Sequence, residues 1–244
     1  MIYRIIRSGI QTGNLQDAFL QLAGFVIALY FAIVLHEVAH GFVAHLNGDD
    51  TAKINGRLTL NPIKHIDPVG ALMMLMVGIG WARPVPIDPR NFRRFRTGIV
   101  TTALAGVTAN LIMAVFGFGM TVAMQAIANA VVKAQGSLTG FNYVAIMLFY
   151  YLFIYMTLLN ISLFAFNLLP IAPLDGFRLV ETFTPPGNWY VRFMYRYGRY
   201  LFLVFILLGL LADFTGWPCD VLGMYIGVIR TGIIKLLSLI FGVA

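Results

Sequence analysis

The chain has few charged residues and only one cysteine. Charged side chains make up 11% of its 244 residues, against about 25% in soluble domains, which excludes an ordinary soluble fold. Cys219 stands alone, so no intrachain disulfide can form and the redox compartment is left open. No polar stretch is long enough for a separate soluble domain. We therefore expect one integral membrane domain over residues 1–244, with a core at about 15–180 and C-terminal helices at about 190–244.

Negative charge is scarcer than positive charge. Ten acidic residues stand against 17 lysines and arginines, and the net charge is +7. No motif that reads nucleic acid accompanies the basic residues, so we expect no nucleic-acid partner. The basic residues gather in residues 51–96 and 176–199, which the positive-inside rule places in the cytoplasm. The N-terminus then lies outside, although Arg4 and Arg7 conflict with that side.

Long apolar runs are abundant. Hydrophobic residues form 59% of the sequence, and the mean hydropathy is +0.82. Because a span needs about 20 residues, the runs predict helices at residues 15–46, 97–132, 143–169, 193–212 and 221–243, the last being either a span or an interfacial helix. Asn14 followed by Asp17 predicts an N-cap for the first helix, and residues 1–13 predict an amphipathic interfacial segment. The fold class is an all-α polytopic membrane protein with about four to six transmembrane helices.

Three shorter features interrupt the apolar runs. Residues 69–82 are uncharged but too few for a span, so we expect a re-entrant or buried segment there. Asn55-Gly56 lies between short alternating runs, which favours a β-hairpin. Residues 79–87 include Pro84 and Pro86, which are compatible with an edge strand but not with a central one.

The pentapeptide His36-Glu37-Val38-Ala39-His40 lies within the first predicted helix. Ionisable residues at membrane depth are costly and indicate a functional site. On a helix, positions i and i+4 share a face, so both imidazoles can bind one metal ion, while the glutamate points about 100° away. A zinc ion held there would lower the pKa of its water, and Glu37 would act as the general base of peptide hydrolysis. With four histidines and two glutamates in the chain, chance is a poor explanation.

A catalytic zinc ion needs three protein ligands and one open position. Val43 and Leu46 stand where a soluble metzincin has its glycine and third histidine, and His45 is interpreted as an interfacial residue. The third ligand must come from elsewhere, and the candidates are Asp49, Asp50, His65, Asp67, Asp175 and Glu181. We favour Asp175, because it follows two helix-breaking prolines at the end of an apolar run. That run and the first one both end on the cytoplasmic side, so the site is expected to face the cytoplasm.

Three asparagines lie within the predicted helices. Asn160 and Asn167 are seven residues apart and share a helical face. They either form hydrogen bonds between helices or point into the site, in support of the substrate or the transition state. Asn110 carries the same ambiguity. We favour Asn167 for the site, since it lies within ten residues of Asp175.

Three motifs follow one another over about residues 30–180. They are HEVAH in a membrane helix, AGVTAN at residues 105–110, and N-x-x-P-x-x-x-x-D-G at residues 167–176. In this order they resemble the site-2 protease family of intramembrane zinc metalloproteases. The stretches GRLTLNP and GWARPVP are similar to the compact bacterial branch that lacks PDZ and CBS domains. Val107 and Ala172 depart from prolines that are common in that family.

This resemblance implies a ligand set and a reaction. His36, His40 and Asp175 would bind one zinc ion per chain, and Glu37 would be the general base. The substrates would be transmembrane proteins, often single-span regulators already cut by another protease. The enzyme would lie among the lipids of a bacterial cytoplasmic membrane.

Substrate handling adds one hypothesis. A transmembrane helix must unwind locally before cleavage, and an edge strand can hold the unwound segment by main-chain pairing. Our candidate strand is residues 79–87, with Trp81, Arg83 and Val85. The predicted hairpin at Asn55-Gly56 is the second candidate.

Two other functions were weighed against proteolysis. A transporter or channel that handles metal ions or protons should contain internal repeats or paired broken helices, and the sequence contains neither. It would also have no need for Glu37 between the histidines. An inactive membrane chaperone of the same fold would not need Glu37 either.

Overall fold

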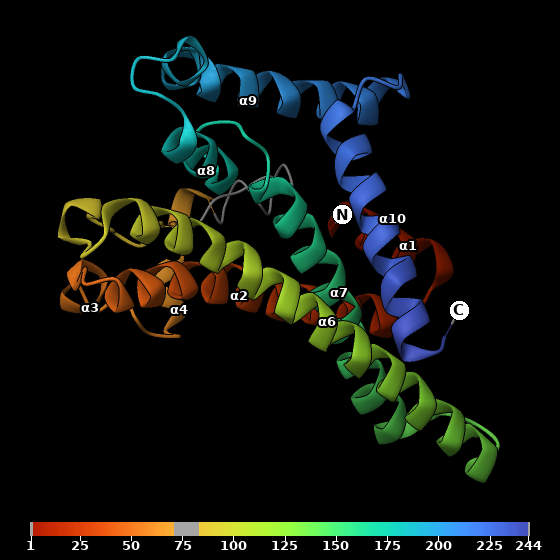
Figure 1. Ribbon diagram of the computed structural model, residues 1–244. Helices are drawn as coiled ribbons and strands as arrows, with labels where there is room; N and C mark the ends of the chain where they lie inside the picture. The colour runs from red at the N-terminus through yellow and green to blue at the C-terminus, as the bar shows by residue number, and fades with distance from the viewer. Residues whose placement is uncertain (1, 71–82, 244) are drawn as a thin grey trace.

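The computed structural model describes residues 2–70 and 83–243 as helices joined by short connections (Figure 1). Before the central helices come α1 (Ile2–Thr12), α2 (Leu15–Leu46), α3 (Thr51–Ile54), α4 (Pro62–His65) and the short 3-10 helix η1 (Pro89–Asn91). After them come α6 (Phe95–Gln135), α7 (Gly140–Asn167), α8 (Asp175–Phe183), α9 (Trp189–Thr215) and α10 (Val221–Phe241). In this described part, α2, α6, α7, α9 and α10 are long and apolar enough to cross a membrane. The predicted all-helical class is confirmed, and these five candidate spans agree with the predicted four to six.

Local signals explain where the long helices begin and end. The side chain of Asn14 accepts a hydrogen bond from the backbone N–H of Asp17 at 3.0 Å, so the predicted N-cap of α2 is confirmed. The amphipathic α1 precedes it and packs against it. Helix α7 ends at Asn167, three residues before Pro170, because a proline lacks the N–H that a continuing helix needs.

The core is formed by α2, α6 and α7, which pack against one another (Figure 1). Two glycines permit the closest approaches. A Cβ atom at Gly24 of α2 would lie 2.7 Å from the backbone nitrogen of Leu152 in α7, and one at Gly117 of α6 would lie 3.0 Å from the carbonyl oxygen of Phe153. Small residues at such contacts are typical of membrane helices, whose association depends on close van der Waals packing.

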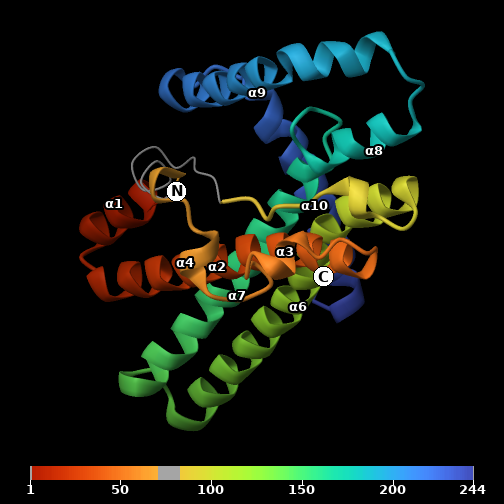
Figure 2. The ribbon, with the colours of Figure 1, turned by 90° about the vertical axis from the view of Figure 1, so that its left-hand side faces the viewer.

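The C-terminal helices pack more loosely on this core. The first half of α9 contacts α8 and the preceding loop, where Ala172, Phe177 and Met194 form a small buried cluster. Helix α10 returns toward the core, and the hydroxyl of Tyr225 donates a hydrogen bond to the carbonyl of Ala165 in α7. Figure 2 shows α9 above the three core helices, and the ring of Phe202 in α9 contacts that of Phe166 near the end of α7.

The hairpin predicted around Asn55-Gly56 is wrong. Residues 51–54 form the one-turn helix α3, which starts where the Thr51 N–H donates to the Asp49 side chain. Asn55 and Gly56 end this turn, and Gly56 takes a φ of +61°. Asn-Gly therefore terminates a helix here instead of joining two strands, because the turn that the Asp49 side chain forms with the Thr51 N–H precedes helical backbone.

The predicted edge strand is not formed by the part of it that the structure describes. Residues 83–88 are extended, but no strand occurs in residues 2–70 and 83–243. Trp81 and the rest of the predicted strand lie outside the described residues, as does most of the predicted re-entrant segment 69–82. Several main-chain groups of residues 83–88, which we call the site segment, bond side chains of other elements, so they form no ladder there.

Candidate metal centre

Two histidines of α2 and one aspartate of α8 meet at a single point. His36 and His40 are one helical turn apart, and their Nε2 atoms are 3.0 Å from each other. The Oδ2 atom of Asp175 lies 3.4 Å from His36 Nε2 and 3.1 Å from His40 Nε2. Among the residues that the structure describes, this is the His/Asp group arranged to hold a metal ion.

Helix α6 holds both imidazoles from the other side. Nδ1 of His36 is 3.1 Å from Oδ1 of Asn110, and Nδ1 of His40 is 2.7 Å from the carbonyl oxygen of Thr102. Because both partners are acceptors, each Nδ1 carries the proton, and each Nε2 is left with a lone pair. Both lone pairs face the Asp175 carboxylate.

The arrangement fits a tetrahedral cation. Oδ2 of Asp175 is buried and has no hydrogen-bond partner among the described residues. Ligand atoms of a tetrahedral zinc site lie about 3.3 Å from one another, close to the three separations observed. Three electron-pair donors at this spacing would repel one another without a cation between them.

Gly106 is a part of this centre that the sequence interpretation did not identify. A Cβ atom there would lie 2.4 Å from His40 Nε2 and 2.6 Å from His36 Cε1. The backbone of α6 therefore passes directly over the two rings, and only glycine leaves room for them. Its place in the AGVTAN motif, one turn before Asn110, was the available signal.

The turn between α7 and α8 delivers Asp175 to the histidines. Helix α8 begins at Asp175, directly after a loop that contains Pro170 and Pro173. A Cβ atom at Gly176 would lie 2.3 Å from the carbonyl oxygen of Leu168. This close approach packs the first turn of α8 against the end of α7 and directs the aspartate toward α2.

Glu37 lies beside the donors without joining them. Its Oε2 atom accepts a hydrogen bond of 2.9 Å from the backbone N–H of Val85 in the site segment. The guanidinium of Arg57 donates to the carbonyl oxygens of Arg83 and Pro84 at 2.6 and 3.1 Å. The N–H of Arg83 donates in turn to the carbonyl of His65. The site segment is thus bound at several points next to the glutamate.

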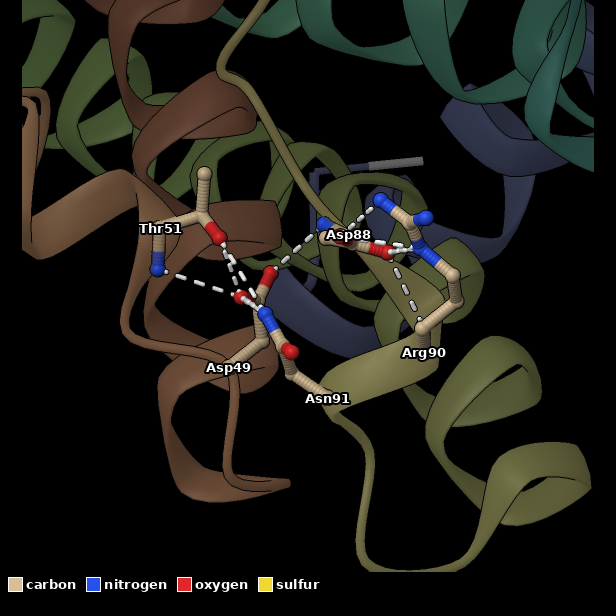
Figure 3. A network of polar contacts seen from close by, with 5 residues as sticks. All are labelled: Asp49, Thr51, Asp88, Arg90 and Asn91. Atoms are coloured by element: carbon tan, nitrogen blue, oxygen red, sulfur yellow. Dashed lines mark hydrogen bonds and ion pairs between the residues drawn. The ribbon is translucent and has the colours of Figure 1, made fainter.

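A buried aspartate fixes the far end of the site segment (Figure 3). Oδ2 of Asp49 accepts the N–H of Asp88 at 2.7 Å, and its Oδ1 accepts the Asn91 side-chain amide at 2.8 Å and the N–H of Thr51 at 3.1 Å. Burial raises the pKa of Asp49, but these hydrogen bonds lower it by a larger amount. The pKa of Asp49 therefore lies below its usual range. Arg90 pairs with Asp88 on the exposed side. The end of α2 is therefore tied to the site segment and to η1.

An open cleft runs past these groups. It is lined by residues from α2, the site segment, η1 and the residue after it, α6, the end of α7, α8 and the loop before α8: His36, Glu37, His40, Pro84, Val85, Ile87, Pro89, Phe92, Ile99, Thr102, Ala103, Asn167, Pro173, Asp175 and Arg178. Water and an extended peptide could therefore approach Glu37 and the metal donors together. Arg178, one turn after Asp175, was not singled out in the sequence.

Of the three candidate asparagines, one lines the cleft and two lie in the helical core. Asn167 lines the cleft, and its amide donates to the Leu163 carbonyl at 3.1 Å. Asn110 and Asn160 are fully buried between helices. Asn110 contacts His36, so it holds a ligand instead of facing a substrate. Asn160 does not line the cleft.

The other candidates for the third ligand are engaged elsewhere. His65 is buried and contacts the carbonyl of Thr59, and Asp67 accepts the N–H of Gly70. Asp50 pairs with His45, while Glu181 accepts the hydroxyl of Tyr195. None of them contacts the two histidines of HEVAH within the described structure.

Comparison with known proteins adds the family. The chain is 42% identical over 219 residues to the Bacillus subtilis (strain 168) protein named "Putative zinc metalloprotease YwhC", covering 88% of this chain and 91% of that protein. The chain belongs to this zinc metalloprotease family. No family model matches it, and no solved structure matches it.

Two mycobacterial relatives share part of their length with this metalloprotease. The protein named "Putative zinc metalloprotease Rip2" from Mycolicibacterium smegmatis is 30% identical over 172 residues, which cover 68% of this chain and 58% of that protein. The Mycobacterium tuberculosis (strain H37Rv) protein of the same name is 28% identical over 173 residues, covering 68% of this chain and 57% of that protein. The chain thus spans less than two thirds of these longer relatives.

Proposed function

We propose that this metalloprotease is an intramembrane zinc endopeptidase of the site-2 protease type, which hydrolyses peptide bonds of transmembrane proteins. The observation that carries the proposal is the convergence of His36 Nε2, His40 Nε2 and Asp175 Oδ2 beside Glu37 in an open cleft. The helices that bear these residues are apolar enough to span a membrane or directly follow one that is.

His36, His40 and Asp175 would hold the zinc ion, which when bound supplies Lewis-acid activation of a water molecule. Asn110 and Thr102 keep the two imidazoles in the tautomer that presents Nε2 to the metal. Glu37 uses one carboxylate oxygen to accept the Val85 N–H. Its other oxygen takes a proton from the attacking water and returns it to the leaving amine.

The site segment is our candidate for presenting the substrate. It runs extended through the cleft beside Glu37, held there by Arg57 and Asp49. An unwound stretch of a substrate helix laid along it would enter the cleft with its peptide bonds exposed. A single-span regulator already cut by another protease is the expected substrate class.

The charge distribution supports a site on the cytoplasmic side. The basic residues of 51–96 and 176–199 flank the end of the molecule where α2 ends and α6 begins. The positive-inside rule then puts this end in the cytoplasm of a bacterial cell.

The decisive experiment replaces Glu37 with glutamine. Glu37→Gln is expected to retain one zinc ion per chain and to lose at least about 100-fold in cleavage of a single-span substrate in proteoliposomes, because general acid–base catalysis contributes about 10²–10⁴-fold. Zinc content is measured by metal analysis of the purified protein.

The other glutamate of the chain is a matched control. Glu181 contacts Tyr195 and does not line the cleft, so Glu181→Gln should cleave at the wild-type rate. Full activity of Glu37→Gln would contradict the general-base role. Zinc- or proton-driven transport by a protein that cleaves nothing would favour the transporter alternative.

A further inference from the structure

Two buried asparagines on neighbouring helices have unused hydrogen-bonding groups. Nδ2 of Asn110 in α6 and Oδ1 of Asn160 in α7 are buried and have no hydrogen-bond partner within the described residues. Both side chains are fully buried. Leaving such groups unpaired is costly, so a donor and an acceptor of this kind in one interface call for a common explanation.

The packing of α6 on α7 places the two asparagines at the same level. The chain reverses between these helices, so they run antiparallel (Figure 1). Gly117 lies against the carbonyl of Phe153. Asn110 lies seven residues before that glycine, and Asn160 lies seven residues after that phenylalanine. Seven residues are about two helical turns, so both asparagines are displaced equally and in the same direction from one contact point.

We infer that Asn160 is a positioning residue of the metal centre, whose Oδ1 is joined to Nδ2 of Asn110 by one buried water molecule that accepts from Nδ2 and donates to Oδ1. Its own amide group is held by the Met156 carbonyl, to which its Nδ2 donates at 2.8 Å. The acceptor of Asn160 is thereby directed away from its own helix. This inference rests on the proposed metal site.

The orientation of the Asn110 amide affects metal binding through the tautomer of His36. If the Asn110 amide turned over, its NH₂ group would face Nδ1 of His36, and the ring would take the tautomer with a proton on Nε2, which cannot bind a metal. Asn160 Oδ1 anchors the water molecule that accepts from Asn110 Nδ2, so Asn160 supports the amide orientation that leaves His36 Nε2 free. Without Asn160, Nδ2 of Asn110 loses this buried partner.

A double-mutant cycle in zinc affinity tests this chain of contacts. The zinc dissociation constant is measured by chelator competition on the full-length protein in detergent, for wild type, Asn160→Leu, Asn110→Leu and the double variant. Each single variant is expected to bind zinc at least about tenfold more weakly, as when partners of metal ligands are removed. The double variant should bind no more weakly than Asn110→Leu, because Asn160 acts through Asn110.

Matched variants separate positioning from packing. Thr157→Val changes another buried side chain of α7, whose hydroxyl bonds only its own helix at Phe153, and should leave zinc affinity within about twofold, as expected for a site with no shared partner. Asn160→Asp, when its buried carboxyl is protonated, keeps a donor for the Met156 carbonyl and an oxygen at the Oδ1 position, and should recover most of the affinity. If Asn160→Leu does not fold, Asn160→Ala replaces it in the same cycle.

The outcomes are distinct. Wild-type zinc affinity in Asn160→Leu, or losses that multiply in the double variant, would overturn the role of Asn160 while leaving the metal site intact. A wild-type protein that binds no zinc would overturn both this role and the proposed function.

Discussion

At the scale of single residues, metal binding depends on which imidazole nitrogens have a lone pair available. Both Nδ1 atoms of the HEVAH histidines are engaged by acceptors on α6, so their Nε2 atoms present lone pairs to Asp175. The same helix comes close enough to do this only because residue 106 has no side chain. The small residue is therefore as necessary to the centre as the ligands themselves.

Gly106→Ala tests this residue-scale argument. The added Cβ would lie 2.4 Å from His40 Nε2, closer than any unstrained contact, so the ring or the helix must shift. We expect zinc affinity to fall by at least about tenfold, comparable with loss of an outer partner, and proteolysis to fall with it. Zinc titration of the purified variant measures the effect.

A glycine in open space provides the control. No atom lies within 4 Å of a Cβ placed at Gly227 in α10. Gly227→Ala should leave zinc affinity unchanged. It should stabilise α10 slightly, since alanine in a helix interior is about 1 kcal/mol more favourable than glycine. Equal zinc affinity in the two alanine variants would contradict the role of Gly106.

At the scale of elements, the site is formed where α2, α6, α8 and the site segment pack together. The segment has no ladder in its described part and is held mainly by side chains, with Asp49 at one end and Arg57 near the other. Asp49 is thus a support for Glu37, although it was first considered as a metal ligand. Its distance from the chemistry makes it a suitable probe of substrate presentation.

Asp49→Asn is expected to loosen the site segment without removing the metal. An amide nitrogen at the Oδ2 position cannot accept the N–H of Asp88, so hydrogen exchange at residues 85–88 should speed up and substrate cleavage should fall by about tenfold, the equivalent of one hydrogen bond to a charged group. Zinc content should stay at the wild-type level. Slow exchange together with normal cleavage would refute the supporting role.

The same variant carries a pH signature. Hydrogen bonds hold the pKa of Asp49 below its unfolded value, so its carboxylate stabilises the fold above an unfolded pKa of about 3.9. That contribution is lost as the pH falls through the lower folded pKa. Asp49→Asn should therefore lose less of its thermal stability than wild type when the pH is lowered from 5 toward 3.

At the scale of the whole molecule, charge distribution is the basis of the orientation that we propose. The ends of the helices that carry the metal donors are bordered by the two basic stretches, 51–96 and 176–199. The turn between α6 and α7 lies at the opposite end of these helices (Figure 1). The proposed orientation, with the site toward the cytoplasm, rests on the positive-inside rule.

Cysteine labelling in intact cells tests this orientation. In a Cys219→Ser background, Asn55→Cys after α3 should react with an impermeant maleimide only after the cells are opened, whereas Ser137→Cys between α6 and α7 should react from outside. Both positions are exposed. The reverse pattern would place the metal centre on the outer side and contradict the proposed orientation.

Local patterns in the sequence were enough to predict the long helices and the two histidine ligands of the metal centre. Apolar runs determine the long helices, because a membrane leaves the backbone no other partner than its own helix. His36 and His40 share a face by helical spacing alone. Asn14 could be assigned as an N-cap for the same reason, since its partner lies three residues away.

Contacts between distant segments were decided only by the tertiary structure. Asp175 lies 135 residues after His40 in the chain, and the fold brings it into contact with both histidines. The fold also identifies Gly106, Thr102 and Asn110 as the residues that hold the two imidazoles. It also shows Asn55-Gly56 ending a helix, because a hydrogen bond to Asp49 outweighs the local turn preference. Spacing along the chain specifies neighbours within one helix, whereas the third donor, the outer partners and the cleft depend on how α2, α6 and α8 pack.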